Sequence, residues 1–192
     1  MHLRELTFRQ RWSHYLAVIF SAVGLVIGLN LRDATLNATT LYVNSQAGIR
    51  AAYPANWLID ESGSYVFRVR DVARAGFNTA IQVATRPVSP VTSTRNVLDD
   101  LNLNRAQTLA AYEVLAEEGF TLPDEVAATA MSYTFVETQD NPFLQGLPVV
   151  VQGLDILTLR GGQALIITFL ADAADFEQLR PTFEQFIRNL EF

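Results

Sequence analysis

The sequence contains no cysteine and no lysine, and its two histidines are His2 and His14. Without cysteine there can be no disulfide and no thiolate metal site. Beyond residue 14 there is no histidine either, which excludes a Ser-His-Asp triad, a Cys-His pair, a lysine Schiff base and a histidine zinc site from that part of the chain. G-x-G-x-x-G, P-loop and G-x-S-x-G motifs are also missing. Carboxylate chemistry remains, as an acid/base pair or a hard-cation site.

The carboxylate groupings favour surface roles. Asp99 and Asp100 fall in a predicted helix, where adjacent side chains point away from each other. Glu117 and Glu118 fall at its predicted end and are interpreted as solvated. The segment 137–142 is typical of a turn, although its oxygens could also hold calcium weakly. We therefore predict no metal, no cofactor and no enzymatic activity.

Basic residues are scarce as well. All 14 are arginine, and beyond Tyr42 there are 10 arginines against 18 aspartates and glutamates. Phosphate binding needs a basic face, so we expect no nucleic-acid partner.

One long hydrophobic run is present, at residues 12–31 (WSHYLAVIFSAVGLVIGLNL), and no charge occurs from Tyr15 to Leu29. A helix of this length crosses a hydrocarbon core of about 30 Å. Arg4, Arg9 and Arg11 precede it, and no basic cluster follows. This asymmetry predicts a cell-membrane protein with a cytoplasmic N-terminus and an extracytoplasmic C-terminal domain.

The run has a second interpretation, as a cleavable signal peptide. Cleavage after Ala38 would place Leu36 at the −3 position, which is a poor site, so an uncleaved anchor is favoured. The predicted organisation is a cytoplasmic tail at 1–11, a transmembrane helix at 12–31, a linker at 32–40 and one domain at 41–192.

The predicted transmembrane helix has a face of small residues, formed by Ala17, Ser21, Gly24 and Gly28. Small side chains let two helices approach closely in lipid, so this face is a candidate contact for a partner helix. The alternative is that the residues only reflect the usual composition of membrane helices.

The remaining sequence alternates between strand and helix patterns. Strands are predicted at 41–44, 49–53, 65–70, 79–85, 127–136, 149–159 and 164–170, with hairpin turns at 45–48 and at Gly161-Gly162. One helix is predicted from Ser93 or Thr94 through Glu118, capped by Gly119, and a second from Pro181 to the end after a break near Arg180. Antiparallel strands with segregated helices indicate the α+β class.

Several of these segments resemble the PsbP-like family over residues 42–192. They are Gly48-Ile49-Arg-Ala-Ala-Tyr53-Pro54-Ala-Asn-Trp57, the mid-chain helix, Ile166-Ile-Thr-Phe-Leu170 and Phe183-Glu-Gln-Phe-Ile-Arg-Asn-Leu190. The resemblance implies a central antiparallel sheet with helices on both faces. It also implies an accessory, assembly or binding role across a membrane, usually without catalysis. The retained membrane helix departs from relatives that carry a cleaved signal or a lipid anchor.

The loop 140–148 (DNPFLQGLP) places Phe143, Leu144 and Leu147 between proline and glycine. Such side chains usually fold back onto the domain, but an exposed set would mark a contact patch. We therefore predict a membrane-anchored accessory protein that binds or stabilises a partner protein or membrane complex. The alternative function is a small-ligand or metal-binding domain, or a hydrolase, that uses carboxylates only.

The anchor interpretation makes a direct prediction about the mature protein. Because the cleavage site is weak, the intact mass of the mature chain should include residues 1–31. Mass spectrometry of the purified membrane fraction measures this. A mass that lacks the first thirty or so residues would contradict the anchor.

Overall fold

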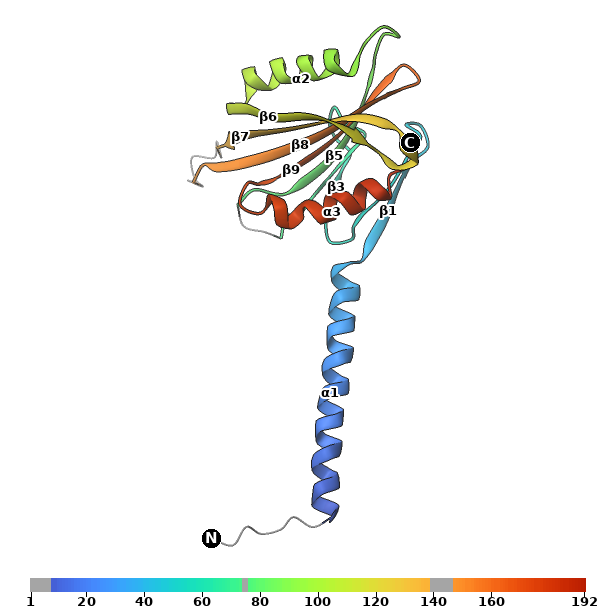
Figure 1. Ribbon diagram of the computed structural model, residues 1–192, viewed down its shortest axis with the longest axis vertical. Helices are drawn as coiled ribbons and strands as arrows, with labels where there is room; N and C mark the ends of the chain where they lie inside the picture. The colour runs from blue at the N-terminus through green and yellow to red at the C-terminus, as the bar shows by residue number, and fades with distance from the viewer. Residues whose placement is uncertain (1–7, 74–75, 139–146) are drawn as a thin grey trace. The chain divides into compact units, whose positions relative to one another are not determined.

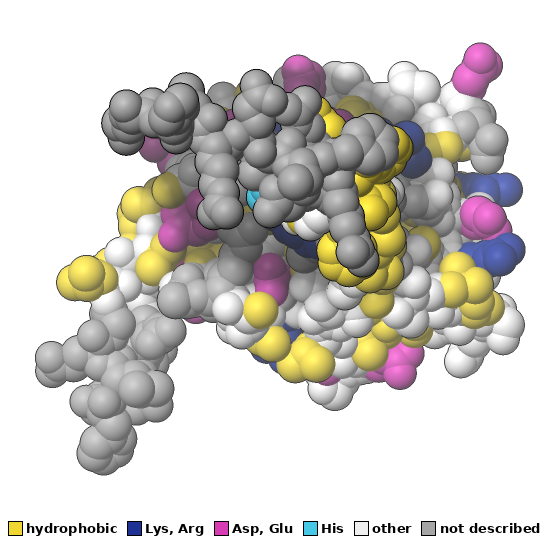
Figure 2. Space-filling view, turned by 90° about the horizontal axis from the view of Figure 1, so that it is seen from below, with side chains coloured by type: hydrophobic (Ala, Val, Ile, Leu, Met, Phe, Trp, Pro, Cys, Tyr) yellow, Lys and Arg dark blue, Asp and Glu magenta, His cyan; other side chains and the backbone are white. Residues whose placement is uncertain are grey.

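The computed structural model describes residues 8–73, 76–138 and 147–192, in two compact units that meet at Thr39 and Thr40. The first unit contains helix α1 (Phe8–Leu36). Its segment Trp12–Thr35 is long and apolar enough to be a candidate membrane span. Figure 2, seen from below, shows exposed hydrophobic side chains, and the large hydrophobic side chains from Trp12 to Leu31 are 47–81% exposed.

Helix α1 extends further than the sequence pattern indicated. The Oγ1 of Thr35 donates a hydrogen bond to the carbonyl of Leu31 at 2.8 Å, and the N–H of Asn37 donates to Asp33 at 3.0 Å. Residues 32–36, expected to be an irregular linker, are therefore helical, and the first strand begins at Thr39.

The second unit contains a small hairpin and a large sheet. The hairpin is β1 (Thr39–Asn44) with β2 (Ile49–Pro54), as predicted. Among the described residues the large sheet has the order β3-β4-β5-β9-β8-β7-β6, and its neighbours pair antiparallel. Its strands are β3 (Leu58–Asp60), β4 (Phe67–Arg70), β5 (Ala80–Pro87), β6 (Ala110–Thr121), β7 (Ala127–Glu137), β8 (Val149–Arg160) and β9 (Gln163–Asp172).

The two-residue turn between β8 and β9 is the hairpin that Gly161 and Gly162 predicted. Their φ angles are +57° and +78°, values that glycine adopts without the strain that a Cβ would bring. The turn sets the register of the two central strands, so that Leu157 lies opposite Ile166.

The prediction of one helix through Glu118 was wrong. Helix α2 (Thr94–Thr108) begins at the capping box of Ser93 and Asn96 and ends at Leu109, which is already extended. The next segment is the edge strand β6, so Glu117 and Glu118 lie on a strand and Gly119 caps no helix. The sequence signal was present, because helical spacing after Leu101 places Asn104, Arg105 and Thr108 where the apolar stripe should continue.

The predicted break before Pro181 is also absent. Helix α3 (Phe176–Arg188) runs continuously with Pro181 inside it. A short 3₁₀ helix at Pro123–Glu125 connects β6 and β7. A mid-helix proline costs about 3 kcal/mol. Phe176 and Leu179 before the proline are buried, as is Phe183 after it, and burying such side chains contributes about 1.5–3 kcal/mol each.

The helices cover opposite faces of the sheet, as predicted (Figure 1). Helix α3 packs on one face, where the rings of Phe169 and Phe183 stack with centroids 4.9 Å apart. Helix α2 packs on the other through Val97, Leu98 and Leu101. The predicted core residues Trp57, Phe183 and Phe186 are 7%, 1% and 1% exposed, which confirms that part of the sequence analysis.

Beneath helix α2 lies a buried ion pair. Arg105 occupies the inward-facing position of the helix, and both of its terminal nitrogens donate to the carboxylate of Asp155 on β8. Asp155 is fully buried and also accepts a hydrogen bond from Thr168 at 2.8 Å. Burial alone would lower the pKa of Arg105, but the adjacent charge of Asp155 raises it above its ordinary value, so the guanidinium stays charged.

Tyr133 completes this arrangement from strand β7. Its ring lies 4.3 Å from the guanidinium carbon of Arg105, and it faces Gly153 across the β7–β8 ladder. A Cβ at position 153 would lie 2.3 Å from the ring, so only glycine leaves room for it. Burial raises the pKa of Tyr133 well above its ordinary value, so the phenol stays neutral.

The first stability prediction concerns the α3 face. Replacing Phe186 with alanine should lower the free energy of unfolding by about 3–5 kcal/mol, because the ring is buried against Phe67 and the sheet. Denaturant unfolding measures this. The control is Leu103→Ala on α2, where the side chain is 62% exposed and the expected change is within about 0.5 kcal/mol. Equal effects of the two variants would contradict the assigned helix face.

The second stability prediction concerns the buried pair. Arg105→Met should cost about 3–5 kcal/mol, because it leaves the Asp155 carboxylate buried without its counter-charge. In the double variant Arg105→Met/Asp155→Asn, the side chain at position 155 is neutral, and its amide oxygen can still accept the hydrogen bond from Thr168. The loss should therefore be smaller than the sum of the single losses by about 0.5–3 kcal/mol. Additive losses in a double-mutant cycle would show that the two charges do not support each other.

Candidate functional site

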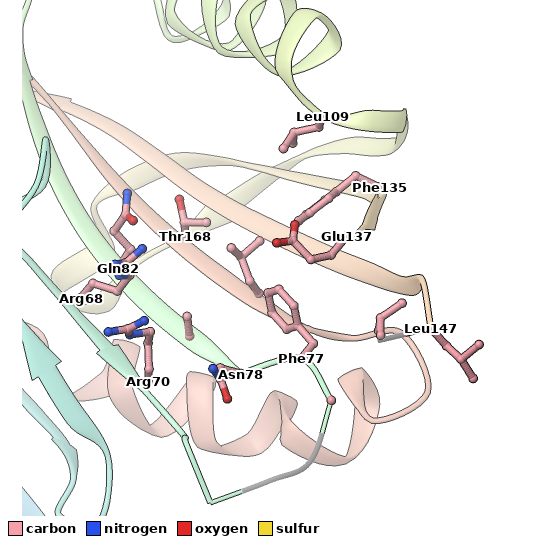
Figure 3. Close-up of a pocket in the computed structure, with 14 residues that line it drawn as sticks. Arg68, Arg70, Phe77, Asn78, Gln82, Leu109, Phe135, Glu137, Leu147 and Thr168 are labelled. Atoms are coloured by element: carbon pink, nitrogen blue, oxygen red, sulfur yellow. The ribbon is translucent and has the colours of Figure 1, made fainter. Parts of the chain in front are cut away.

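The candidate site is a groove on the α2 face of the sheet. Helix α2 packs over β6 and β8, and it leaves the part of this face formed by β4 and the beginning of β5 uncovered. The hollow there has a volume of about 720 Å³ (Figure 3). We call it the arginine groove. Its polar lining is Arg68, Arg70, Asn78, Gln82, Glu137 and Thr168, and its main apolar lining is Phe77, Leu109, Phe135, Leu147, Val149 and Leu170.

Strand register builds the floor of the arginine groove. Arg68 on β4 lies opposite Gln82 on β5, and Gln82 lies opposite Thr168 on β9. Thr168 in turn lies opposite Asp155 on β8. Side chains directly opposite in neighbouring strands are in contact range on one face of a sheet. A row of polar side chains therefore crosses four strands, from the open groove to the buried ion pair beneath α2.

Arg68, the residue at the open end of this row, donates a hydrogen bond to Asp60 on β3. Its carboxylate accepts from the N–H of Ser62 at 2.9 Å and from its hydroxyl at 2.6 Å. It also accepts from the phenol of Tyr65 at 2.7 Å and from Arg68 at 2.8 Å. These hydrogen bonds, led by those from Ser62 and Tyr65, hold the pKa of Asp60 well below its usual range. The carboxylate thus stays charged and orients the guanidinium of Arg68.

The second row of the floor changes character along its length. Arg70 on β4 lies opposite Ala80, and Ala80 lies opposite Leu170. Figure 3 shows Arg68 and Arg70 at one end of the arginine groove, with Phe135 and Glu137 at the other and Phe77 between them. The site is therefore cationic at one end and mainly apolar toward the other. This arrangement suits the binding of a molecule that has an anionic group at one end and an apolar part at the other.

The residues predicted as contacts are distributed over both units. Leu147 is 86% exposed and borders the arginine groove. Phe143 and Leu144 lie outside the described residues. Ala17, Ser21, Gly24 and Gly28 follow one another at helical spacing on α1, and a Cβ added at either glycine meets no described atom within 4 Å. The face that they form is open in the described part of the chain.

The described residues offer little for carboxylate catalysis. They contain no group of three or more histidine, cysteine, aspartate or glutamate side chains that could hold a metal ion. The arginine groove has a single acidic lining residue in this part of the chain, Glu137. Asp99 and Asp100 lie on α2, and Asp100 pairs with Arg86 at 3.2 Å on the surface. Of the predicted turn at 137–142, Glu137 and Thr138 lie within the described residues.

Sequence reasoning missed the two arginines of the groove. The alternation in Tyr65–Arg70 predicts a strand, and the structure has one at Phe67–Arg70, β4. The side of β4 that carries the two arginines is the uncovered part of the α2 face. The alternation was a usable signal, but the residues opposite Arg68 and Arg70 are set by pairing with strands far along the chain.

Comparison with known proteins at the sequence level found no matching family model, and no curated protein matched. Solved structures do match. The solution structure of cyanobacterial PsbP (CyanoP) from Synechocystis sp. PCC 6803 matches with a TM-score of 0.58 and 14% identity, over 80% of this chain and 92% of that one.

Two further structures share the fold. LpqN of Mycobacterium tuberculosis, described as involved in cell envelope biogenesis, matches with a TM-score of 0.52 and 13% identity, over 80% of this chain and 89% of that one. The Saccharomyces cerevisiae Ran-binding protein Mog1p matches with a TM-score of 0.50 and 11% identity, over 80% and 95%. The antiparallel sheet with a helix on each face therefore gives this chain a PsbP-like fold.

Proposed function

We propose that this protein is a non-enzymatic accessory protein held in the cell membrane by residues 12–31. Its N-terminus is cytoplasmic, and its domain on the extracytoplasmic side binds or stabilises a partner protein or a larger membrane complex. The observation that carries the proposal is helix α1, whose 24-residue apolar segment is not buried by any described part of the chain. A water-soluble protein gains nothing from exposing such a surface.

The exposed side chains of α1 support an anchor. Phe20 is 81% exposed and Val18 is 67% exposed, values that suit contact with lipid. Trp12 near the start of the segment suits the membrane interface. The small-residue face gives the same helix a means of contacting a second helix, because backbones approach closely where side chains are small.

The fold and the chemistry of the domain support a binding role. The chain has no cysteine or lysine, and no histidine after His14, so the common catalytic arrangements cannot form in the domain. Proteins with the same fold include one described as Ran-binding and one described as involved in envelope biogenesis. We infer a second contact through Leu147, together with Phe143 and Leu144, because Leu147 is exposed.

The test is cross-linking of the full-length tagged chain in its native membrane, followed by solubilisation in mild detergent. In the double variant Gly24→Leu/Gly28→Leu the added side chains should block close helix approach. A specific cross-linked partner should then be lost or reduced at least fivefold. Leu147→Asp should reduce cross-linking of the same partner without changing thermal unfolding, because the side chain is exposed.

The control is Ala22→Leu, which adds a leucine side chain on a different side of α1. It should leave the cross-linked partner unchanged. If parent, control and both test variants fold, insert and capture the same partner equally, the docking proposal is wrong. If the mature chain lacks α1, the membrane-anchored role is wrong.

A further inference from the structure

The arginine groove contains hydrogen-bond donors that the described part of the chain does not use. The Nε atoms of Arg68 and Arg70 are buried and have no hydrogen-bond partner there. Buried donors are usually satisfied, so two unpartnered Nε atoms on these two groove arginines indicate that an acceptor for the guanidinium groups is missing.

Asp60 does not supply that acceptor for Arg70. Its oxygens already accept from Ser62, Tyr65 and Arg68. The nearest terminal nitrogen of Arg70 lies 3.9 Å from Asp60, which is an ion pair but too long for a hydrogen bond. Arg70 therefore retains a partly exposed guanidinium at the edge of the hollow. A planar guanidinium binds a carboxylate best, through two parallel hydrogen bonds.

The rest of the arginine groove indicates what kind of molecule would carry a carboxylate bound by these arginines. Beyond the arginines, the wall and floor are formed by Phe77, Phe135, Val149 and Leu170. These side chains offer apolar contact and no counter-charge. The volume of about 720 Å³ lies in the range of small-molecule sites, about 300–1,000 Å³.

Glu137 sets the orientation of an occupant. It is exposed and lies at the end of the groove opposite the arginines (Figure 3). A second anionic group at that end would be repelled, and an anion entering in the reverse direction would meet the same charge. The lining therefore matches one anionic group at the arginine end and an uncharged body.

We propose that the arginine groove is a binding site for a small amphiphilic carboxylate, with its carboxylate on Arg70 and Arg68 and its apolar body against Phe77, Phe135 and Leu170. This goes beyond partner-protein binding by α1 and Leu147, and it does not depend on it. The occupant is a small organic acid with one carboxylate and a short hydrocarbon or aromatic body.

The test is equilibrium dialysis of the full-length chain in detergent against radiolabelled hexanoate. Micelles take up some probe without the protein, so the Arg70→Gln variant in the same detergent serves as the reference. The matched control is Arg86→Gln, which removes the same charge from an exposed arginine that pairs with Asp100 outside the groove. The parent and Arg86→Gln should bind hexanoate saturably, and Arg70→Gln should bind it at least tenfold more weakly.

Three related probes separate the two ends of the site. Acetate, which lacks the apolar body, should bind at least tenfold more weakly than hexanoate. Hexylamine and hexan-1-ol have the same number of carbons but no carboxylate, and they should show no saturable binding. If Arg70→Gln does not fold, Arg70→Lys replaces it. Lysine keeps the charge but not the paired hydrogen bonds, and it should also weaken hexanoate binding.

Several outcomes would overturn the proposal. Absence of saturable hexanoate binding to the parent chain is one. Equal affinities of Arg70→Gln and Arg86→Gln would show that Arg70 has no specific role in binding. Equal binding of hexanoate, hexylamine and hexan-1-ol would show a site without recognition of the carboxylate. None of these results bears on the cross-linking through α1, so the two proposals fail independently.

Discussion

The fully buried carboxylate of Asp155 determines how the α2 face of the sheet is built. A charge in that position is tolerated only with a counter-charge and hydrogen bonds, which Arg105 and Thr168 provide. Arg105 comes from α2, so the ion pair ties that helix to strand β8. Tyr133 packs against the guanidinium, and it has room to do so because Gly153 has no side chain. Helix α2 is thereby held over one half of the face, and the other half remains open.

The open half continues the same polar row. Thr168 and Gln82 connect the buried pair to Arg68, and Asp60 orients that arginine through a carboxylate already occupied by other donors. The α3 face shows the contrast, because there the aromatic rings of Phe169 and Phe183 stack within a hydrophobic core. The sheet thus has a mainly hydrophobic face beneath α3 and an opposite face with a hollow that has charged and apolar ends.

Local patterns predicted most elements and failed where distant pairing decided the result. The hairpin at Gly161-Gly162 follows from a local rule, since both residues need positive φ. Strand β6 does not follow from such a rule. Its sequence also has helical spacing, and it is extended because it pairs along β7. Helix α3 passes through Pro181 because burial on both sides of the proline outweighs the lost hydrogen bond.

The sequence by itself determined the apolar helix, the α+β class, the core positions of Trp57 and Phe186, and the exclusion of histidine, cysteine and lysine chemistry. These depend on composition and on periodicity within one element. The tertiary structure decided the site. Arg68, Gln82 and Thr168 are far apart in the chain, and only the pairing of β4, β5 and β9 places them side by side. Register is a long-range property of the sheet, so no local pattern in the sequence contains it.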